Sequence, residues 1–160
     1  MKKAEIFSMQ RIRGFTLLEL MITLVVVAVI LGLAVPSFQT TIAKNAVKSA
    51  TRDLVATLNT ARAQSMSSRT PVTVTPESGG WNNGWTLAYG SSVESGETYV
   101  PSSKVRISSS ITSLTFRPQG GLSAPASSLT VCHADSSIPG RKITVSFLGR
   151  VSTEEVTTGC

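Results

Sequence analysis

Glu19 is the residue whose type and position most clearly indicate chemistry. It is the only charged side chain in a 22-residue apolar stretch, residues 15–36. An ionised carboxylate in the middle of a membrane helix costs roughly 2.5–3.5 kcal/mol on insertion scales, and such residues usually have a function. The alternative is an ordinary membrane anchor in which the glutamate has no role.

Two cysteines, Cys132 and Cys160, are the next candidates. Both follow the apolar stretch, so they could pair in an oxidising compartment and close a 28-residue loop. A metal site is not expected, because two cysteines and the single His133 cannot fill a tetrahedral shell. We also read no nucleophile–base pattern around His133, which we expect at the surface, so the sequence predicts neither an enzyme nor a bound cofactor.

Basic residues near the carboxy terminus form a third candidate group. Arg141, Lys142 and Arg150 could make a small basic patch, although Glu154 and Glu155 follow closely. The formal net charge of the chain is +6, but the first 14 residues supply half of it. A small remaining charge does not by itself indicate nucleic-acid binding, and a solvated sheet edge is the simpler interpretation.

The apolar stretch that carries Glu19 has the length of a membrane helix. At about 1.5 Å per residue, 22 residues span roughly 33 Å, which matches a bilayer core. Lys2, Lys3, Arg11 and Arg13 precede it, against Glu5 alone, so the flank should stay cytoplasmic and the rest should lie across the membrane. The run is longer than the apolar region of a typical secretory signal peptide, which argues against one.

A second helical segment is predicted over residues 37–69, ending near residues 66–69 because Pro71 disfavours helix at Thr70. Apolar and small residues recur at three- and four-residue steps and predict one buried face. That face comprises Ile42, Ala46, Val47, Ala50, Leu54, Leu58, Ala61 and Ser65. A basic stripe of Lys44, Lys48 and Arg52 lies elsewhere on the helix; we interpret it as solvated, with contact to acidic headgroups or a neighbouring subunit as the alternative.

Residues 70–160 show the two-residue period and frequent turns of an antiparallel β domain. We expect short strands at residues 72–75, 85–89, 98–100, 105–107, 113–116, 129–132, 143–147 and 150–151. Pro139-Gly140 fits a type II turn. Trp81 and Trp85 are expected to cover the helix as part of the core, with a ligand-stacking platform as the alternative. The fold class is therefore α+β, with the helix over residues 37–69 packed on an antiparallel sheet.

The start of the apolar stretch resembles the class III signal of type IV pilins and type II secretion pseudopilins. The matching run is Arg13-Gly14-Phe15-Thr16-Leu17-Leu18-Glu19. The resemblance implies that residues 1–14 are a prepilin leader, that prepilin peptidase cleaves between Gly14 and Phe15, and that Phe15 is N-methylated. It also implies that Glu19 pairs with the free amine of a neighbouring subunit during assembly, and that residues 15–36 form the transmembrane and assembly part of one long pilin helix.

Later segments resemble the GspH/FimT group of minor pilins. They are Trp81-Asn82-Asn83-Gly84-Trp85, Phe116-Arg117-Pro118-Gln119-Gly120 and residues 143–151. The resemblance implies a type IV pilin fold and a minor pilin that acts in pilus assembly, priming or tip structure and supports twitching motility. The implied partners are other major and minor pilins and prepilin peptidase. The implied location is the inner membrane, single-pass with a periplasmic carboxy-terminal domain, before incorporation into a surface pilus.

Two other functions stay open. A minor pseudopilin of a type II secretion system has the same amino terminus and fold; a carboxy-terminal disulfide between Cys132 and Cys160 weakly favours a pilus. A DNA-binding minor pilin for natural transformation is the second, since some relatives carry Gly-Arg-x-Arg near the carboxy terminus. Here the run is Gly149-Arg150-Val151-Ser152, without the second arginine, and the nearby glutamates repel phosphate.

Overall fold

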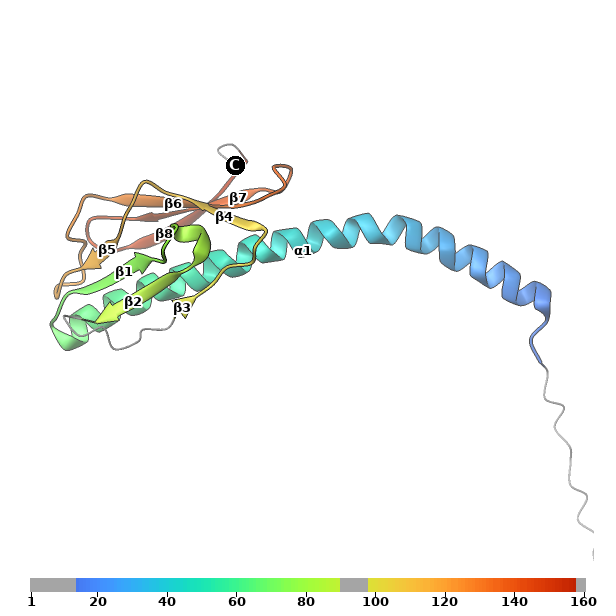
Figure 1. The fold of residues 1–160 in the computed structure, drawn as a ribbon, viewed down its shortest axis with the longest axis horizontal. Helices are drawn as coiled ribbons and strands as arrows, with labels where there is room; N and C mark the ends of the chain where they lie inside the picture. The colour runs from blue at the N-terminus through green and yellow to red at the C-terminus, as the bar shows by residue number, and fades with distance from the viewer. Residues whose placement is uncertain (1–13, 90–97, 158–160) are drawn as a thin grey trace, which may run out of the picture. The chain divides into compact units, whose positions relative to one another are not determined.

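The computed structural model describes residues 14–89 and 98–157. It divides into two compact units, Met1–Phe38 and Gln39–Cys160, which we treat separately. One helix, α1 (Leu17–Ser68, 52 residues), contributes to both units. All the described strands belong to the second unit, where they gather along the carboxy-terminal part of α1 (Figure 1).

The carboxy-terminal part of α1 buries one face, as its spacing predicts. The buried positions are Ala43, Val47, Ala50, Thr51, Leu54, Thr57, Leu58, Ala61 and Ser65. The prediction is wrong at Ile42, whose side chain is 60% exposed, because the first buried turn begins at Ala43. The helix ends at Ser68, as predicted, and Arg69 follows with a φ of 55°.

Within residues 14–89 and 98–157, eight strands form two four-stranded antiparallel sheets. The first sheet has the order β3-β2-β1-β5 and the second the order β4-β6-β7-β8. The strands are β1 (Val72–Pro76), β2 (Trp85–Tyr89), β3 (Thr98–Tyr99), β4 (Val105–Ser108), β5 (Leu114–Phe116), β6 (Ser127–His133), β7 (Gly140–Val145) and β8 (Val151–Val156). The expected α+β architecture is thus present, with the strands divided between two sheets rather than joined in one.

The hairpin of β7 and β8 differs most from the sequence prediction. The strand expected at 143–147 ends at Val145, because Ser146 and Arg150 close a turn in which the Ser146 N–H donates to the Arg150 carbonyl at 2.9 Å. Gly149 has a φ of 77° in that turn. Gly140 already lies in β7, so the type II turn expected at Pro139-Gly140 is wrong; residues 134–138 make the connection instead.

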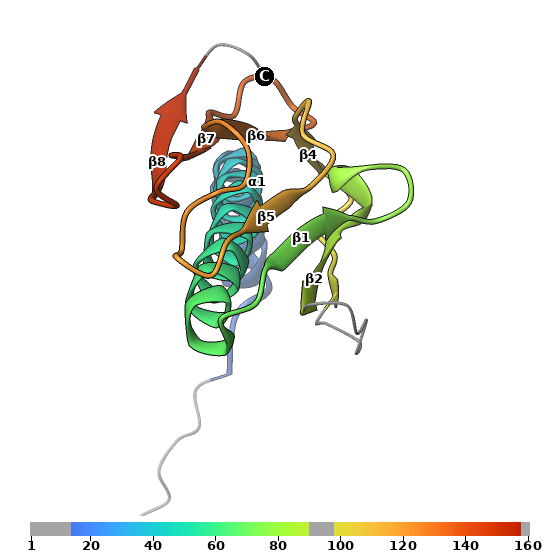
Figure 2. The same cartoon turned by 90° about the vertical axis from the view of Figure 1, so that its left-hand side faces the viewer.

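One hydrophobic core joins the buried face of α1 to residues of both sheets. The view along the helix shows α1 lying beside the strands of both sheets (Figure 2). Trp81, in the short 3-10 helix η1 (Trp81–Asn83), and Trp85 are 4% and 1% exposed. The Trp85 Nε1–H donates to Thr57 Oγ1 on α1 at 3.0 Å. Both indoles therefore belong to the core, as expected, and leave no stacking platform.

Candidate functional site

The amino-terminal part of α1 has no cover within its unit. Its large hydrophobic side chains over residues 17–31 are all between 49% and 80% exposed. The mean hydropathy of its most apolar 18-residue window is 2.8, which is sufficient by length and composition to cross a membrane. Such a surface requires an apolar environment, either lipid or other helices.

Thr16 and Glu19 together begin this helix. Thr16 stands just before Leu17, the first helical residue, and its Oγ1 accepts a hydrogen bond from the Glu19 N–H at 3.2 Å. This is half of a capping box, in which a threonine satisfies a free N–H of the first turn. The Glu19 carboxylate is exposed in that turn, where its charge also suits the helix dipole. It is therefore accessible to a partner.

Gly14 and Phe15, the residues of the expected cleavage site, precede α1 and are exposed. Phe15 is 82% exposed. The peptide bond between them lies outside regular secondary structure, and exposed segments of this kind are preferred sites of proteolysis. Cleavage and N-methylation nevertheless stay predictions, and the leader before Gly14 lies outside the described residues.

Cys132 lies on β6 and is 5% exposed. No described cysteine is free. Cys160 lies outside the described residues, so the bond between Cys132 and Cys160 stays a prediction.

The three basic residues considered for DNA binding do not form one patch. Arg141 and Lys142 are neighbours on β7 and therefore point to opposite faces of the sheet. Each is paired across to β8: Arg141 with Glu155 at 3.6 Å, and Lys142 with Glu154 at 3.7 Å. Arg150 is exposed in the turn before β8, four residues and roughly 13 Å along the strand from Glu154.

The segment after β6 contains His133 and Asp135, which serve the local turn. The Asp135 N–H donates to His133 Nδ1 at 3.0 Å, and the Ser137 N–H donates to Asp135 Oδ1 at 2.9 Å. The bond from Ser137 lowers the pKa of the Asp135 carboxyl from its ordinary value. Across residues 14–89 and 98–157 no group of three or more His, Cys, Asp or Glu side chains could hold a metal ion.

Comparison with known families decides the classification. The model of the family described as type II transport protein GspH matches residues 50–149, more than half of the chain. The chain belongs to the GspH family. A second model, the prokaryotic N-terminal methylation motif, matches residues 9–35, which include Gly14, Phe15 and Glu19. Comparison with curated proteins gives no match.

Two solved structures share the fold of this GspH-family chain. Both are of the type IV minor pilin FimU from Pseudomonas aeruginosa strain PAO1. One has a TM-score of 0.57 and 23% identity over 67% of this chain and 91% of that chain. The other has a TM-score of 0.55 and 23% identity over 69% and 89%. The expected membership of the GspH/FimT group and the α+β pilin fold are therefore confirmed.

Two stretches that the sequence analysis assigned to the GspH/FimT group meet in space. The Leu122 N–H, just after the first stretch, donates to the Phe147 carbonyl of the second at 2.9 Å. A Cβ added at Gly149 would collide with the Gly120 carbonyl, and the Arg117 guanidinium lies 5.5 Å from the centre of the Phe147 ring. We call the contact between residues 117–122 and 146–150 the corner of the domain. It depends on close backbone contact, which explains its glycines.

Two structural residues of this GspH-family chain escaped sequence reasoning. Thr16 caps α1, and the Thr-x-x-Glu spacing with Glu19 was the available signal. Arg62 donates from Nε to the Gly120 carbonyl at 3.0 Å and so attaches α1 to the corner. No periodicity could have indicated Arg62, because its partner is a backbone atom 58 residues away.

Proposed function

We propose that this GspH-family chain is a minor pilin of a type IV pilus, acting in assembly priming or at the filament tip and supporting twitching motility. The observation that carries the proposal is the uncovered apolar part of α1, which begins at an N-terminal methylation motif and contains one accessible carboxylate, Glu19. The carboxy-terminal part of α1, by contrast, is covered by its own domain.

The proposed mechanism is assembly by exchange of environment. Prepilin peptidase removes residues 1–14, and the new amino terminus at Phe15 becomes N-methylated. The apolar helix then leaves the lipid and packs among the helices of other pilins, which cover the same surface. Glu19 neutralises the Phe15 amine of an adjacent subunit, so that neither charge is left unpaired in the apolar bundle.

The proposed location before assembly is the inner membrane, with a single pass and a periplasmic carboxy-terminal domain. The support is the length and hydropathy of α1 and the excess of basic residues before it. The oxidising periplasm would allow Cys132 and Cys160 to pair.

A minor pseudopilin of a type II secretion system is the second candidate, favoured by the description of the matching family. Deleting the chain distinguishes the two when one culture is scored for sheared surface pili, twitching motility and secreted exoproteins. Loss of pili and twitching with normal secretion is the expected result. Lost secretion with normal pili would assign the chain to secretion.

DNA binding has less support than either assembly role. Two of its three candidate residues, Arg141 and Lys142, are already paired with glutamates, and Arg150 lies apart from them. If the deletion left pili, twitching and secretion normal but abolished DNA uptake, the assembly proposal would be wrong and the DNA-binding alternative would replace it.

A further inference from the structure

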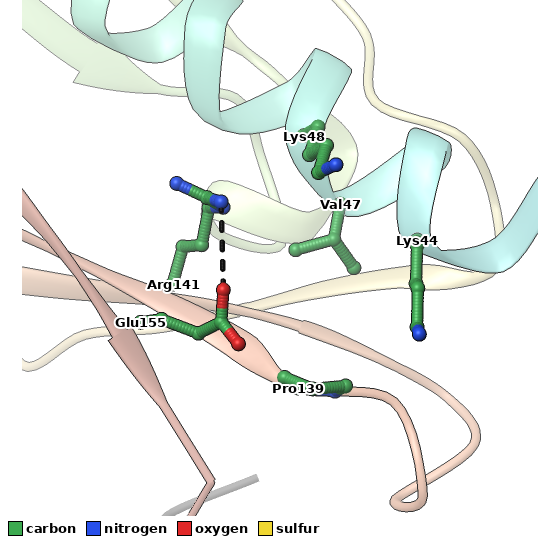
Figure 3. A pocket seen from close by; sticks show the side chains of 6 residues that line it. All are labelled: Lys44, Val47, Lys48, Pro139, Arg141 and Glu155. Atoms are coloured by element: carbon green, nitrogen blue, oxygen red, sulfur yellow. Dashed lines mark ion pairs between the residues drawn. The ribbon is translucent and has the colours of Figure 1, made fainter. Parts of the chain in front are cut away.

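The second unit contains a groove between α1 and the inner face of the β7–β8 hairpin. It consists of two adjoining cavities of about 220 Å³ and 320 Å³, which share Lys48 and Arg141. The first is lined by Lys44, Val47, Lys48, Pro139, Arg141 and Glu155, and the second by Lys48, Thr51, Arg52, Val55, Arg141 and Thr153. We call this the basic groove; Figure 3 shows its first cavity, with Lys44 and Lys48 on the α1 side and the Arg141–Glu155 ion pair on the side of the sheet.

The charges of the basic groove are unbalanced. Among the described residues that line it are four cations, Lys44, Lys48, Arg52 and Arg141, and one acid, Glu155. Arg141 and Glu155 are paired at 3.6 Å, but the Glu155 side chain is 60% exposed, so the ion pair is weak and another carboxylate can replace Glu155. Glu155 thus shows, within the chain, which group the groove accepts: a carboxylate facing Arg141.

The lining residues of the basic groove have nearly the same spacing along α1 as along strand β8. Glu155 shares the first cavity with Lys44 and Lys48, and Thr153 shares the second with Lys48 and Arg52. A step of two residues along β8 covers roughly 6.7 Å, and a step of four residues along α1 covers roughly 6 Å, so the two spacings are nearly equal. An extended peptide with acidic side chains at alternate positions would have the same repeat as the three cations of the helix.

Strand β8 also supplies backbone groups for such a peptide. It is the last strand of its sheet and pairs only with β7 among the described strands. Its residues Ser152 to Glu155 are exposed. An open strand edge can pair with an added extended segment through main-chain hydrogen bonds, while the side chains of that segment give specificity.

We propose that the basic groove is a docking site for an extended, carboxylate-rich segment of a neighbouring pilin subunit. The segment lies along the edge of β8, and its alternate carboxylates face Lys44, Lys48 and Arg52. That the partner is a pilin rests on the proposed function, whereas the preference of the groove for spaced carboxylates does not. Nucleic acid fits less well, because the Glu155 carboxylate lines the groove and repels phosphates.

Fluorescence anisotropy with the full chain in nonionic detergent tests the groove directly. The probe is a labelled peptide of about ten residues in which glutamate and threonine alternate, at about 50 mM salt so that screening is modest. A peptide of the same composition with its glutamates consecutive tests the spacing, and a single-stranded oligothymidine of similar length tests nucleic acid. None of these measurements depends on pilus assembly, so failure here is distinct from failure of the assembly role.

We expect the alternating peptide to bind more tightly than the other two probes. The double variant Lys48→Gln/Arg52→Gln should weaken it roughly tenfold, the loss expected from two exposed ion pairs. The matched variant Lys104→Gln/Arg106→Gln removes the same charge just before and on β4, the strand at the opposite edge of the sheet, and should change binding less than about twofold. Glu155→Gln should tighten binding, because it removes the competing carboxylate.

Three results would overturn the proposal. Equal affinity for the two peptides would mean that the groove does not distinguish alternating from consecutive carboxylates. Tighter binding of the oligothymidine would make nucleic acid the ligand. Equal weakening by the groove variant and the β4 variant would mean that only the overall charge of the chain matters.

Discussion

At the scale of single residues, Glu19 combines two roles that the sequence alone did not separate. Its N–H completes the cap of α1 with Thr16, and its carboxylate remains accessible in the first turn. The backbone role survives any substitution that retains helix, because it uses the N–H. The carboxylate role does not, so a side-chain substitution isolates it.

We expect Glu19→Val to leave leader cleavage intact while preventing incorporation into the filament, because the amine of the adjacent Phe15 would stay unpaired in an apolar bundle. The measurement is a comparison of processed chain in membranes and in sheared filaments by immunoblot. Thr23→Val is the matched control: its hydroxyl donates only to the Leu20 carbonyl of the same helix, at 2.9 Å, so incorporation should continue. Normal incorporation of Glu19→Val would remove the proposed charge role.

Gly149 is a second residue whose type is dictated by its position. It has a φ of 77°, and a Cβ there would collide with the Gly120 carbonyl. We expect Gly149→Ala to lower the free energy of unfolding by about 3 kcal/mol or more, since backbone strain and a backbone collision add.

Gly120→Ala is the matched control for Gly149→Ala. Gly120 has a similar φ of 81°, but its added Cβ would meet Met66 Sδ at 2.6 Å, the end of a flexible side chain that can move. Gly120→Ala should therefore lower the free energy of unfolding only by the backbone strain of its positive φ, about 1–2 kcal/mol. Urea denaturation measures both, and equal losses would contradict the collision.

At the scale of elements, the sequence predicted what depends on local pattern and missed what depends on neighbours. The carboxy-terminal end of α1 was predictable because Pro71 follows it, and its buried face because the spacing is helical. The end of β7 was not, because Val145-Ser146-Phe147 alternates like a strand while the turn at Gly149 ends it. Division into two sheets also depends on long-range pairing, which short alternating runs do not encode.

The corrected buried face of α1 gives an element-scale prediction. Leu54 is fully buried in the core shared with both sheets, whereas Ile42 is 60% exposed. We expect Leu54→Ala to reduce the free energy of unfolding by about 2–5 kcal/mol, through lost burial and the cavity left behind. Ile42→Ala should change it by no more than about 0.5 kcal/mol. Chemical denaturation of both variants measures these changes. A large decrease in the free energy of unfolding for Ile42→Ala would mean that Ile42 does pack in the core.

At the scale of the whole molecule, the predicted bond between Cys132 and Cys160 would tie the end of the chain to β6. Closing a 28-residue loop should stabilise the domain by about 3.5 kcal/mol through the entropy of the unfolded chain. We therefore expect no free thiol in nonreducing mass spectrometry, and a melting temperature several degrees lower for Cys160→Ser. A free thiol in the purified chain, or an unchanged melting temperature for Cys160→Ser, would contradict the bond.

The division into two units predicts that the second unit folds without the first. Every buried core residue lies within residues 43–145, inside the second unit, while the described residues 15–31 are uncovered. A chain of residues 39–160 should therefore unfold in one cooperative transition, with a midpoint in urea close to that of the full chain in detergent. It should also enter no filament, because it lacks Glu19 and the apolar helix. A midpoint well below that of the full chain would mean that the amino-terminal unit stabilises the domain, and a gradual transition would mean that residues 39–160 do not fold as one unit. Incorporation without the apolar helix would show that assembly does not depend on it.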